Sequence, residues 1–319
     1  MPPQASKPRI LPHLSFLPIQ GPHLLVKLLV TGGAGFLGRR VASAALERGH
    51  EVVVLSRHPD RVRDLPPGVS VIGGDLTAPQ DLKGRLAELA PQGVIHAAAV
   101  VVDHDPQLHS VNVEGTAALC SMLGGLSPAP RLVYVSTFSV EDIPSTAYSD
   151  SKLAAESVVR ASELPHAVMR PALIYGKGDS TNTPDLVARM AAGTQWLPGG
   201  GRVLIQPVHV DDVALACVMA SEQKDVSGKT YRLGGPEPVT VRAYREAIRD
   251  ASGGSARIRG LPLNMMNLAA GLLATLGKPR AQQVLAFHLT DHTVDSGEAQ
   301  RDLNFQPRSL TEGLRTTFA

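Results

Sequence analysis

The stretch TGGAGFLG, residues 31–38, decides the fold of this chain. It follows the apolar run KLLV at 27–30 and precedes a helical pattern. Its three glycines permit a sharp turn after a strand, close approach of backbone to a ligand, and tight packing of a helix on a sheet. The N–H groups that open the helix suit a phosphate. We therefore expect a dinucleotide-binding loop with contacts at Gly32, Gly35, Phe36, Leu37 and Gly38.

Beyond this loop, short apolar runs alternate with helical patterns. Such alternation predicts βαβ units and a parallel sheet with helices on both faces. The expected strands are 28–30, 52–55, 70–72, 93–97, 132–135, 167–170 and 208–210, and the expected helices are 39–48, 82–89, 111–123 and 151–161.

The expected fold class is α/β, with a Rossmann, doubly wound parallel sheet and a smaller C-terminal substrate domain. The alternation becomes irregular after Gly176, which marks the boundary. We expect a dinucleotide-binding domain over 26–175 with a return segment at about 207–235, and a substrate-binding domain made of 176–206 and 236–319.

Two segments stand apart from this pattern. Prolines interrupt every apolar run in residues 1–25, which predicts a disordered tail and no secretory signal. A second interpretation is that translation starts at Val26, because valine can be encoded by an alternative start codon. Residues 261–277 form the longest apolar stretch, shorter than the ~20 residues that span a bilayer. We expect a helix of the second domain that lines an apolar pocket, with a membrane-surface helix as the less favoured alternative.

The composition excludes several classes of protein. Lys and Arg total 31 and Asp and Glu total 29, so no electrostatic footprint for nucleic acid is present. Cys120 and Cys217 are too few for a disulfide scaffold. The His, Cys and carboxylate residues lack metal-ligand spacing. We expect a cytoplasmic protein without a metal, whose partner is a small-molecule substrate.

Further motifs follow in a fixed order: GDL at 74–76, VIHAAA at 94–99, NVEGT at 112–116, YVST at 134–137, YSDSK at 148–152, RPALIYG at 170–176 and HVDDVA at 209–214. Together with the GxxGxxG loop they resemble the extended short-chain dehydrogenases, the NAD-dependent epimerase/dehydratase family. The resemblance runs from Lys27 to the end of the chain. GKGD at 176–179 and the Leu/Met-rich segment after Leu261 look more like the 3β-hydroxysteroid dehydrogenase branch.

The candidate catalytic pair is Tyr148 and Lys152, which lie four residues apart at the start of a helical pattern. This spacing puts both side chains on one helix face. A free phenol has a pKa near ~10, and a neighbouring ammonium lowers it. Tyr148 can then exchange a proton with an alcohol or carbonyl. The resemblance implies that Lys152 also bonds the nicotinamide ribose and that Thr137 bonds the substrate oxygen.

The resemblance also implies cofactor contacts outside the glycine loop. Asp75 matches the polar partner of adenine, and the small residues at 97–99 let the cofactor lie flat. Asn112 is expected to be a structural neighbour of the cofactor, whereas His96 and His209 are expected to be purely structural. The further cofactor-binding candidates are Ser56, Arg57, Asp75, Leu76, Ala97, Ala98, Ala99, Asn112, Ser136, Tyr148, Lys152 and Pro171.

The residues after the second strand bear on the choice of cofactor. No acidic residue stands there to bond a ribose diol, and Ser56 and Arg57 occupy the position. A guanidinium pairs well with a 2′-phosphate, and Arg39 and Arg40 could add to this. NADP(H) is therefore favoured. NAD(H) remains open, because Arg57 can instead stack on adenine.

Two departures from the family bear on the substrate. The connection 138–147 is short, which predicts an open mouth. Ile205 stands where nucleotide-sugar members carry an arginine that clamps a diphosphate, and Arg202 is three residues early. These features favour an NADP(H)-dependent oxidoreductase for an apolar secondary alcohol or ketone, sterols included. A nucleotide-sugar epimerase or dehydratase and a non-catalytic NAD(P)-sensing protein are the alternatives. The resemblance implies a homodimer through the helices at 111–123 and 151–161.

Overall fold

The computed structural model describes residues 26–141, 145–179, 183–262, 264 and 290–319. The predicted tail at 1–25 and nearly all of the apolar segment 261–277 lie outside the described residues.

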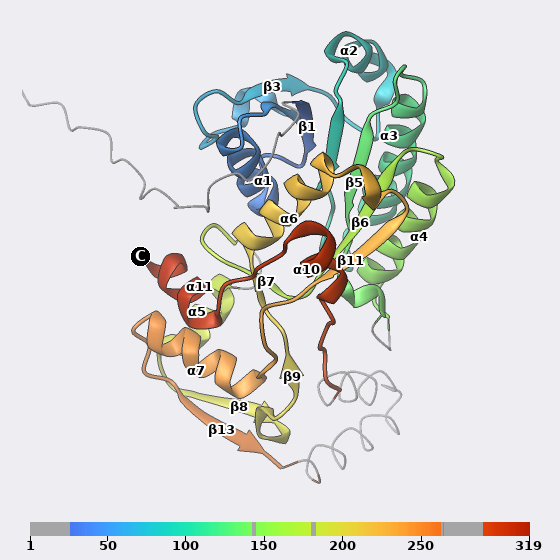
Figure 1. Ribbon diagram of the computed structural model, residues 1–319. Coiled ribbons are helices and arrows are strands. Elements are labelled where there is room, and N and C mark those ends of the chain that lie inside the picture. Colours follow the sequence, from blue (N-terminus) through green and yellow to red (C-terminus); the bar gives the residue numbers. More distant parts are fainter. Residues whose placement is uncertain (1–25, 142–144, 180–182, 263, 265–289) are drawn as a thin grey trace, which may run out of the picture.

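A seven-stranded sheet forms the centre of the molecule (Figure 1), and its strand order is β11-β6-β5-β4-β1-β2-β3. Every neighbouring pair is parallel. Leu28, Leu29 and Val30 of the central strand are fully buried, as expected for a strand covered on both faces. The strands are β1 (Lys27–Thr31), β2 (Glu51–Ser56), β3 (Ser70–Gly73), β4 (Gly93–His96), β5 (Arg131–Val135), β6 (His166–Pro171) and β11 (Lys229–Leu233).

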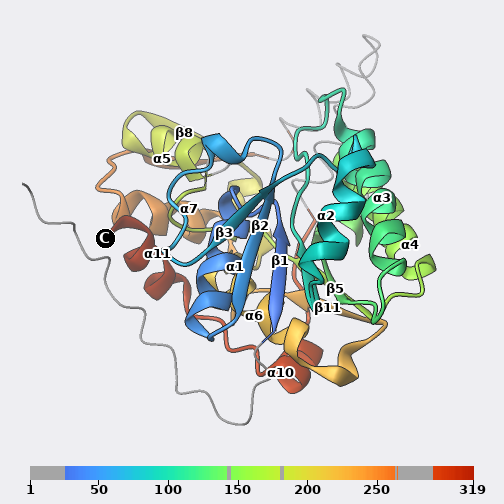
Figure 2. The same ribbon diagram turned by 90° about the horizontal axis from the view of Figure 1, so that it is seen from above.

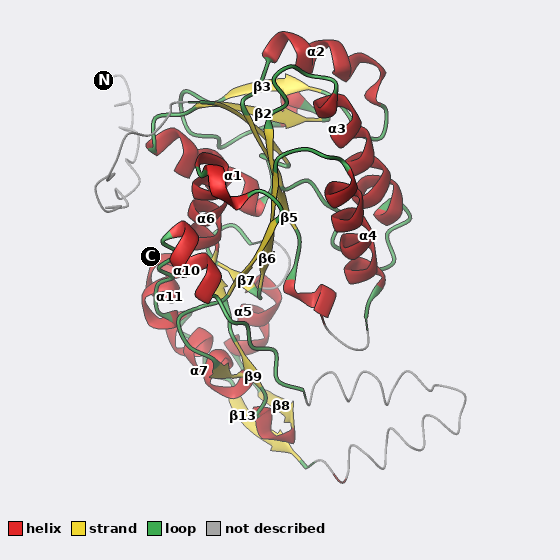
Figure 3. Cartoon of the chain, turned by 45° about the vertical axis from the view of Figure 1, so that its right-hand side comes forward, coloured by secondary structure: helices red, strands yellow, loops and turns green. Residues whose placement is uncertain are grey.

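Helices cover both faces of the sheet, as Figure 3 shows. One face packs against α1 (Phe36–Glu47), α6 (Val210–Glu222) and α10 (Gly297–Leu303), and α1 and α6 also contact each other. The other face packs against α2 (Leu82–Leu89), α3 (Gly115–Gly124) and α4 (Ala147–Ala161). The core is made mainly of Val, Leu and Ala, each buried side chain of Val or Leu size contributing about 1.5–3 kcal/mol of burial free energy.

A smaller unit lies beyond the carboxyl end of the sheet (Figures 1 and 2). Its core contains Tyr175, Met190, Tyr244, Ile248 and Leu314. Its helices are α5 (Thr183–Ala191), α7 (Val241–Ala251) and α11 (Leu310–Phe318), and its short strands are β7 (Ile174–Tyr175), β8 (Thr194–Pro198), β9 (Leu204–Ile205), β10 (Val208–His209), β12 (Val239–Thr240) and β13 (Arg257–Leu261). They pair as β10 with β7, β12 with β9 and β13 with β8.

The six N-terminal strands predicted from the sequence are confirmed, with ends within a residue or so of those expected. The predicted strand 208–210 is shorter, because Val210 already begins α6. Helix α6 was not expected at all. It is buried on nearly all sides, so its sequence lacks the one-sided apolar periodicity that marks a surface helix.

Three helix starts also differ from expectation, among them α1, which begins at Phe36 rather than 39. Helix α4 begins at Ala147 rather than 151, because Thr146 accepts a hydrogen bond from the N–H of Ser149 and caps the helix there. The predicted helix 111–123 is split into a π-helical segment, Ser110–Glu114, followed by α3. Such segments inside helices are frequent at functional sites.

Within the described ranges, no helix combines the length and the apolar character needed to cross a membrane. The same residues contain no group of three or more His, Cys, Asp or Glu side chains arranged to hold a metal.

Candidate active site

The loop 31–38 has the shape that its glycines predict. Gly32 has a φ of +69°, and a Cβ there would lie 2.7 Å from backbone atoms of both Ala97 and Ala98. A Cβ on Gly38 would collide with the carbonyl oxygen of Gly32. Helix α1 then begins after Gly35 without any side-chain cap, so its first N–H groups are not used by a capping side chain. The loop is therefore a cradle that fits the pyrophosphate of a dinucleotide.

The strand order reverses between β1 and β4, which lie side by side. In open parallel sheets, ligands bind at the carboxyl ends of the strands next to such a point. The sequence-predicted residues gather along this edge, although they come from distant parts of the chain. They lie after β1 (Gly32–Gly38), at the end of β2 (Ser56, Arg57), after β3 (Asp75, Leu76), after β4 (Ala97–Ala99), after β5 (Ser136, Thr137) and at the end of β6 (Pro171).

The segment after β2 contains an arginine that has no partner among the described residues. Arg57 is exposed and makes no hydrogen bond or ion pair with the rest of the described chain. Ser56 Oγ accepts a hydrogen bond from the N–H of His58 at 3.2 Å. Arg40, in contrast, is ion-paired with Asp211 of α6, and Arg39 Nε donates to the carbonyl of Ala34 at 2.7 Å. Arg57 is thus the arginine of this group that is free to meet an added phosphate.

After β3, Asp75 stabilises its own turn. Its Oδ1 accepts hydrogen bonds from the N–H of Thr77 at 2.9 Å and from the Thr77 hydroxyl at 2.8 Å. The side chain of Leu76 is buried in the core under α2 and α3. A contact of Leu76 with a cofactor would therefore use its backbone.

Lys152 is enclosed beneath the end of β5. Its Nζ donates a hydrogen bond to the carbonyl of Val135 at 2.7 Å and lies 4.3 Å from the centre of the Tyr134 ring. The side chain is 2% exposed, and burial lowers its pKa to about 7, against an opposing effect of Glu156. The amine can therefore change charge near neutral pH.

Tyr148 lies in the first turn of α4, one turn before Lys152. Burial raises the pKa of Tyr148 to about 12. This is opposite to the lowering that we expected from a neighbouring ammonium. Burial dominates because Lys152 is directed at Val135 and acts on the phenol too weakly to counter it. The phenol is protonated at neutral pH, so it is suited to donating a proton.

Asn112 lies in the π-helical segment, is 1% exposed and joins three elements. Its Oδ1 accepts from the N–H of Val100 at 2.8 Å, and its Nδ2 donates to the carbonyl of Val100 and to Ser151 Oγ, both at 2.9 Å. Ser151 Oγ in turn donates to the carbonyl of Tyr148. Asn112 thereby ties the loop after β4 to the start of α4.

Asp103 makes a second link between the loop after β4 and the start of α4, and the sequence analysis did not identify it. Its Oδ1 accepts a hydrogen bond from the N–H of Tyr148 at 2.8 Å. Between the two ties, Val101 and Val102 are 49% and 58% exposed, which is unusual for adjacent valines. A contact across 45 residues of sequence leaves no local signal that could have identified it.

The hydroxyls after β5 differ in environment. Thr137 Oγ1 is hydrogen-bonded to Ser139 Oγ at 2.7 Å and is partly buried. Ser136 is 3% exposed, and its Oγ has no hydrogen-bond partner among the described residues. Thr137 is therefore the more accessible of the two.

The two histidines that we expected to be structural are buried. His96 is hydrogen-bonded to Thr31 Oγ1 at 2.6 Å and to Thr116 Oγ1 at 2.9 Å, and burial lowers its pKa to about 3. Burial likewise lowers the pKa of His209 to about 4, and its Nδ1 accepts from the N–H of Asp211. Both rings are neutral at physiological pH, as their structural role requires.

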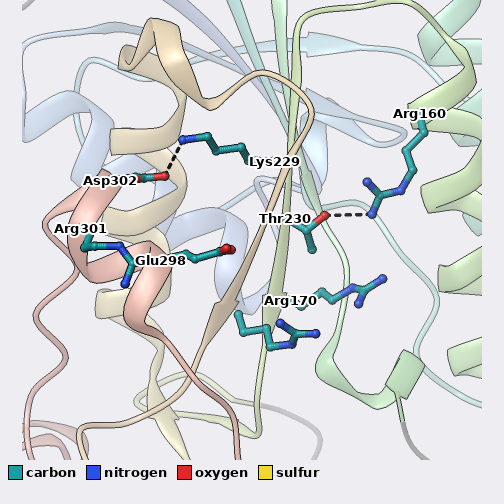
Figure 4. A pocket seen from close by; sticks show the side chains of 8 residues that line it. Arg160, Arg170, Lys229, Thr230, Glu298, Arg301 and Asp302 are labelled. Atoms are coloured by element: carbon teal, nitrogen blue, oxygen red, sulfur yellow. Dashed lines mark hydrogen bonds and ion pairs between the residues drawn. The ribbon is translucent and has the colours of Figure 1, made fainter.

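Two cavities lie away from the catalytic pair. The first, about 500 Å³, follows β11 and is lined by the charged side chains in Figure 4, among them Arg160 and Arg170. The second, about 420 Å³, is lined by Gly200, Arg202 and Arg242 of the smaller unit. Ile205 packs against the core of that unit and pairs with Val239.

The comparisons with known proteins cover nearly the whole chain. The model of the NAD dependent epimerase/dehydratase family matches residues 28–234. A 2-alkyl-3-oxoalkanoate reductase from Stenotrophomonas maltophilia is 30% identical, over 91% of this chain and 98% of the relative. A 3-beta-hydroxysteroid dehydrogenase from Mycolicibacterium neoaurum is 26% identical, over 90% of this chain and 89% of the relative. A solved UDP-glucose 4-epimerase from Thermus thermophilus in complex with NAD has a TM-score of 0.72 at 23% identity, covering 92% of this chain and 97% of that one; at this identity the likeness shows the fold alone.

Proposed function

Because the chain belongs to the NAD dependent epimerase/dehydratase family and is an NAD(P)-dependent oxidoreductase, we propose that it reduces the carbonyl of an apolar ketone and prefers NADP(H). The observation that carries this proposal is the position of Lys152, one helical turn after Tyr148, with its amine at the end of β5, on the edge of the sheet where the glycine loop also follows β1. Residues 26–175 with 207–235 would bind the cofactor, and 176–206 with 236–319 would bind the substrate.

The residues of the cradle fit the cofactor. Gly32, Gly35 and Gly38 and the first N–H groups of α1 would hold the pyrophosphate, and a Cβ on Gly32 or Gly38 would push against the neighbouring backbone and distort this loop. Arg57 would pair with a 2′-phosphate, since its guanidinium is exposed and unpaired within the described chain. When bound, the nicotinamide supplies the hydride.

Residues of the chain itself supply the proton that carbonyl reduction requires. Tyr148, protonated because burial raises its pKa to about 12, donates its phenolic proton to the substrate oxygen as that oxygen gains charge. The hydroxyl of Thr137 holds the same oxygen in place. Lys152, held by the carbonyl of Val135, would bond the nicotinamide ribose, as in the family that the chain resembles.

Three observations support an apolar ketone as the substrate class. The relatives include the 2-alkyl-3-oxoalkanoate reductase, the 3-beta-hydroxysteroid dehydrogenase and a Stigmatella aurantiaca ketoreductase whose name specifies a substrate with a farnesyl group. Val101 and Val102 expose apolar surface beside the N-terminus of α4. Ile205 packs into an apolar core and offers no cation to a diphosphate.

The test is a turnover assay that follows nicotinamide absorbance with NADPH and NADH. The substrates are a 2-alkyl-3-oxoalkanoate, a 3-ketosteroid and UDP-glucose, and the matched control is Tyr148→Phe. We expect oxidation of NADPH with an apolar ketone, lost in the variant. Epimerisation of UDP-glucose leaves nicotinamide absorbance unchanged and is followed by separating the product sugar nucleotides; its occurrence without any ketone reduction would refute the proposal and favour a nucleotide-sugar enzyme. Tight cofactor binding with no turnover on any ketone or sugar would favour a sensor.

A further inference from the structure

Glu156 is a buried carboxylate that the proposed mechanism does not use. It lies on α4 four residues after Lys152, so both side chains share one face of the helix. Lys152 is 2% exposed and Glu156 is 1% exposed. A carboxylate this deeply buried is costly unless it is paired and hydrogen-bonded, so its presence beside the candidate catalytic lysine needs a physical reason.

Two arginines hold Glu156 in its ionised form. Arg170 of β6 donates from Nε to Oε1 at 2.8 Å and from Nη2 to Oε2 at 2.6 Å, which is the bidentate geometry of a strong ion pair. Arg160 Nη2 donates to Oε2 at 3.1 Å. Burial is the largest single effect and would raise the pKa of Glu156, but the hydrogen bonds and charges of its partners, led by Arg170, together outweigh it and keep that pKa below its usual value.

Glu156 is enclosed, whereas its two arginines reach toward solvent. Figure 4 shows Arg170 and Arg160 among the side chains that line the cavity along β11. Arg170 also donates to Glu141 at 2.6 Å, and Glu141 accepts from Arg232 as well. The carboxylate is thus anchored by a fixed guanidinium of β6, and Lys152 lies one turn earlier on the same helix.

The other described groups around Lys152 are neutral, so none of them can take the place of the negative charge of Glu156. From β5 it meets the carbonyl of Val135 and the ring of Tyr134, and from β4 it faces His96, which is neutral because burial lowers its pKa to about 3. Tyr148, one turn earlier on the same helix, is protonated at neutral pH and carries no charge. Among the described residues, Glu156 is the carboxylate whose charge favours the protonated lysine.

We propose that Glu156 is a positioning residue, which keeps the ammonium of Lys152 charged and directed at the end of β5. Residues with this helical spacing lie about 5–6 Å apart at Cβ. No hydrogen bond or ion pair joins Lys152 and Glu156 in the described chain, so the attraction acts through space. The proposal rests on the proposed function for its catalytic meaning, since it assigns Glu156 to the lysine of the candidate catalytic pair.

The first test reads Lys152 directly and needs no substrate. The full chain is labelled with lysine carrying carbon-13 at the ε position, the Lys152 signal is assigned with Lys152→Arg, and the signal is followed against pH. In Glu156→Gln we expect the pKa of Lys152 to fall by about 1–2 units, the size typical of losing one neighbouring opposite charge. Glu156→Asp, which keeps the charge, should recover part of the shift.

The matched control is Glu141→Gln. Glu141 bonds the same Arg170, so this variant disturbs the same ion-pair network from the side away from Lys152. We expect the pKa of Lys152 to stay at the wild-type value. If Glu156→Gln fails to fold because Arg170 is left without its partner, the double variant Glu156→Gln/Arg170→Gln removes both charges, and the Lys152 pKa should still be lowered.

The second test is the pH profile of kcat with a ketone that the wild-type enzyme reduces. The alkaline limb should move to lower pH in Glu156→Gln by the shift seen in the titration, with little change in KM. An unchanged Lys152 pKa in the folded variant, or an equal shift in Glu141→Gln, would overturn the proposal. A shift in the titration without ketone reduction by the wild type would support the role of Glu156 and count against the proposed function, whereas reduction without a shift would do the reverse.

Discussion

A single methyl group on Gly32 tests whether the loop 31–38 is shaped for a ligand. The φ of +69° at Gly32 costs a residue with a side chain about 1–2 kcal/mol. The new Cβ would also lie 2.7 Å from Ala97 C and from Ala98 N and 2.8 Å from Ala97 O, and such crowding against backbone costs about 1–3 kcal/mol more. We therefore expect Gly32→Ala to lose about 2–5 kcal/mol of unfolding free energy.

The assay is urea unfolding of the full chain, followed by calorimetric titration of NADPH into the folded variant. Relief of the crowding would move the loop away from Ala97 and Ala98, so cofactor affinity should fall together with stability. The matched control is Gly84→Ala on α2, where a Cβ meets nothing within 4 Å. That variant should gain about 0.5–1 kcal/mol and bind NADPH normally. Unchanged unfolding and unchanged affinity in Gly32→Ala would refute the reasoning.

Three further outcomes follow from the site. Tyr148→Phe should keep NADPH binding and lose about 10²–10⁴-fold in kcat, since the proton donor is gone; near-normal turnover would remove Tyr148 from the mechanism. Arg57→Ala should weaken NADPH at least roughly ten-fold more than NADH in titrations, because only NADPH carries the 2′-phosphate, whereas equal weakening would mean adenine stacking. Burial lowers the pKa of Lys152 from 10.5 to about 7, so the unfolded chain binds this proton more tightly and the free energy of unfolding should rise between about pH 7 and 10. Urea unfolding of Lys152→Met should not show this rise with pH, and a rise as large as in the wild type would contradict the lowered pKa of Lys152.

The sequence predicts the parallel sheet well because each strand is a short apolar run between turns. Burial on both faces makes such runs continuous, as for Leu28–Val30. The same enclosure hides α6, in which Val213, Ala216 and Cys217 are all buried and leave no polar face to mark the helix. A pattern can therefore reveal a buried strand and miss a buried helix, because only the helix depends on a polar side to be recognised.

Sequence motifs predict several residues of the candidate site, but they do not predict which contacts those residues make. The spacing of Tyr148 and Lys152 predicts their shared helix, but not that Lys152 turns to the carbonyl of Val135. It therefore gives the wrong direction for the pKa of Tyr148, which burial decides. Asp103 reaches Tyr148 across 45 residues of sequence, and no local pattern announces such a contact.

The way the sheet ends at β11 affects how the protein behaves at high concentration. An outermost strand offers unpaired N–H and C=O groups to any extended chain, which is the usual route to fibrous aggregation. Side chains of this strand bond to neighbouring elements: Lys229 pairs with Asp302 and Thr230 accepts from Arg160 (Figure 4). Arg232 pairs with Glu141. A foreign strand would have to displace these interactions and desolvate the charges before its first backbone hydrogen bond could form. These interactions therefore disfavour aggregation of the protein through strand β11.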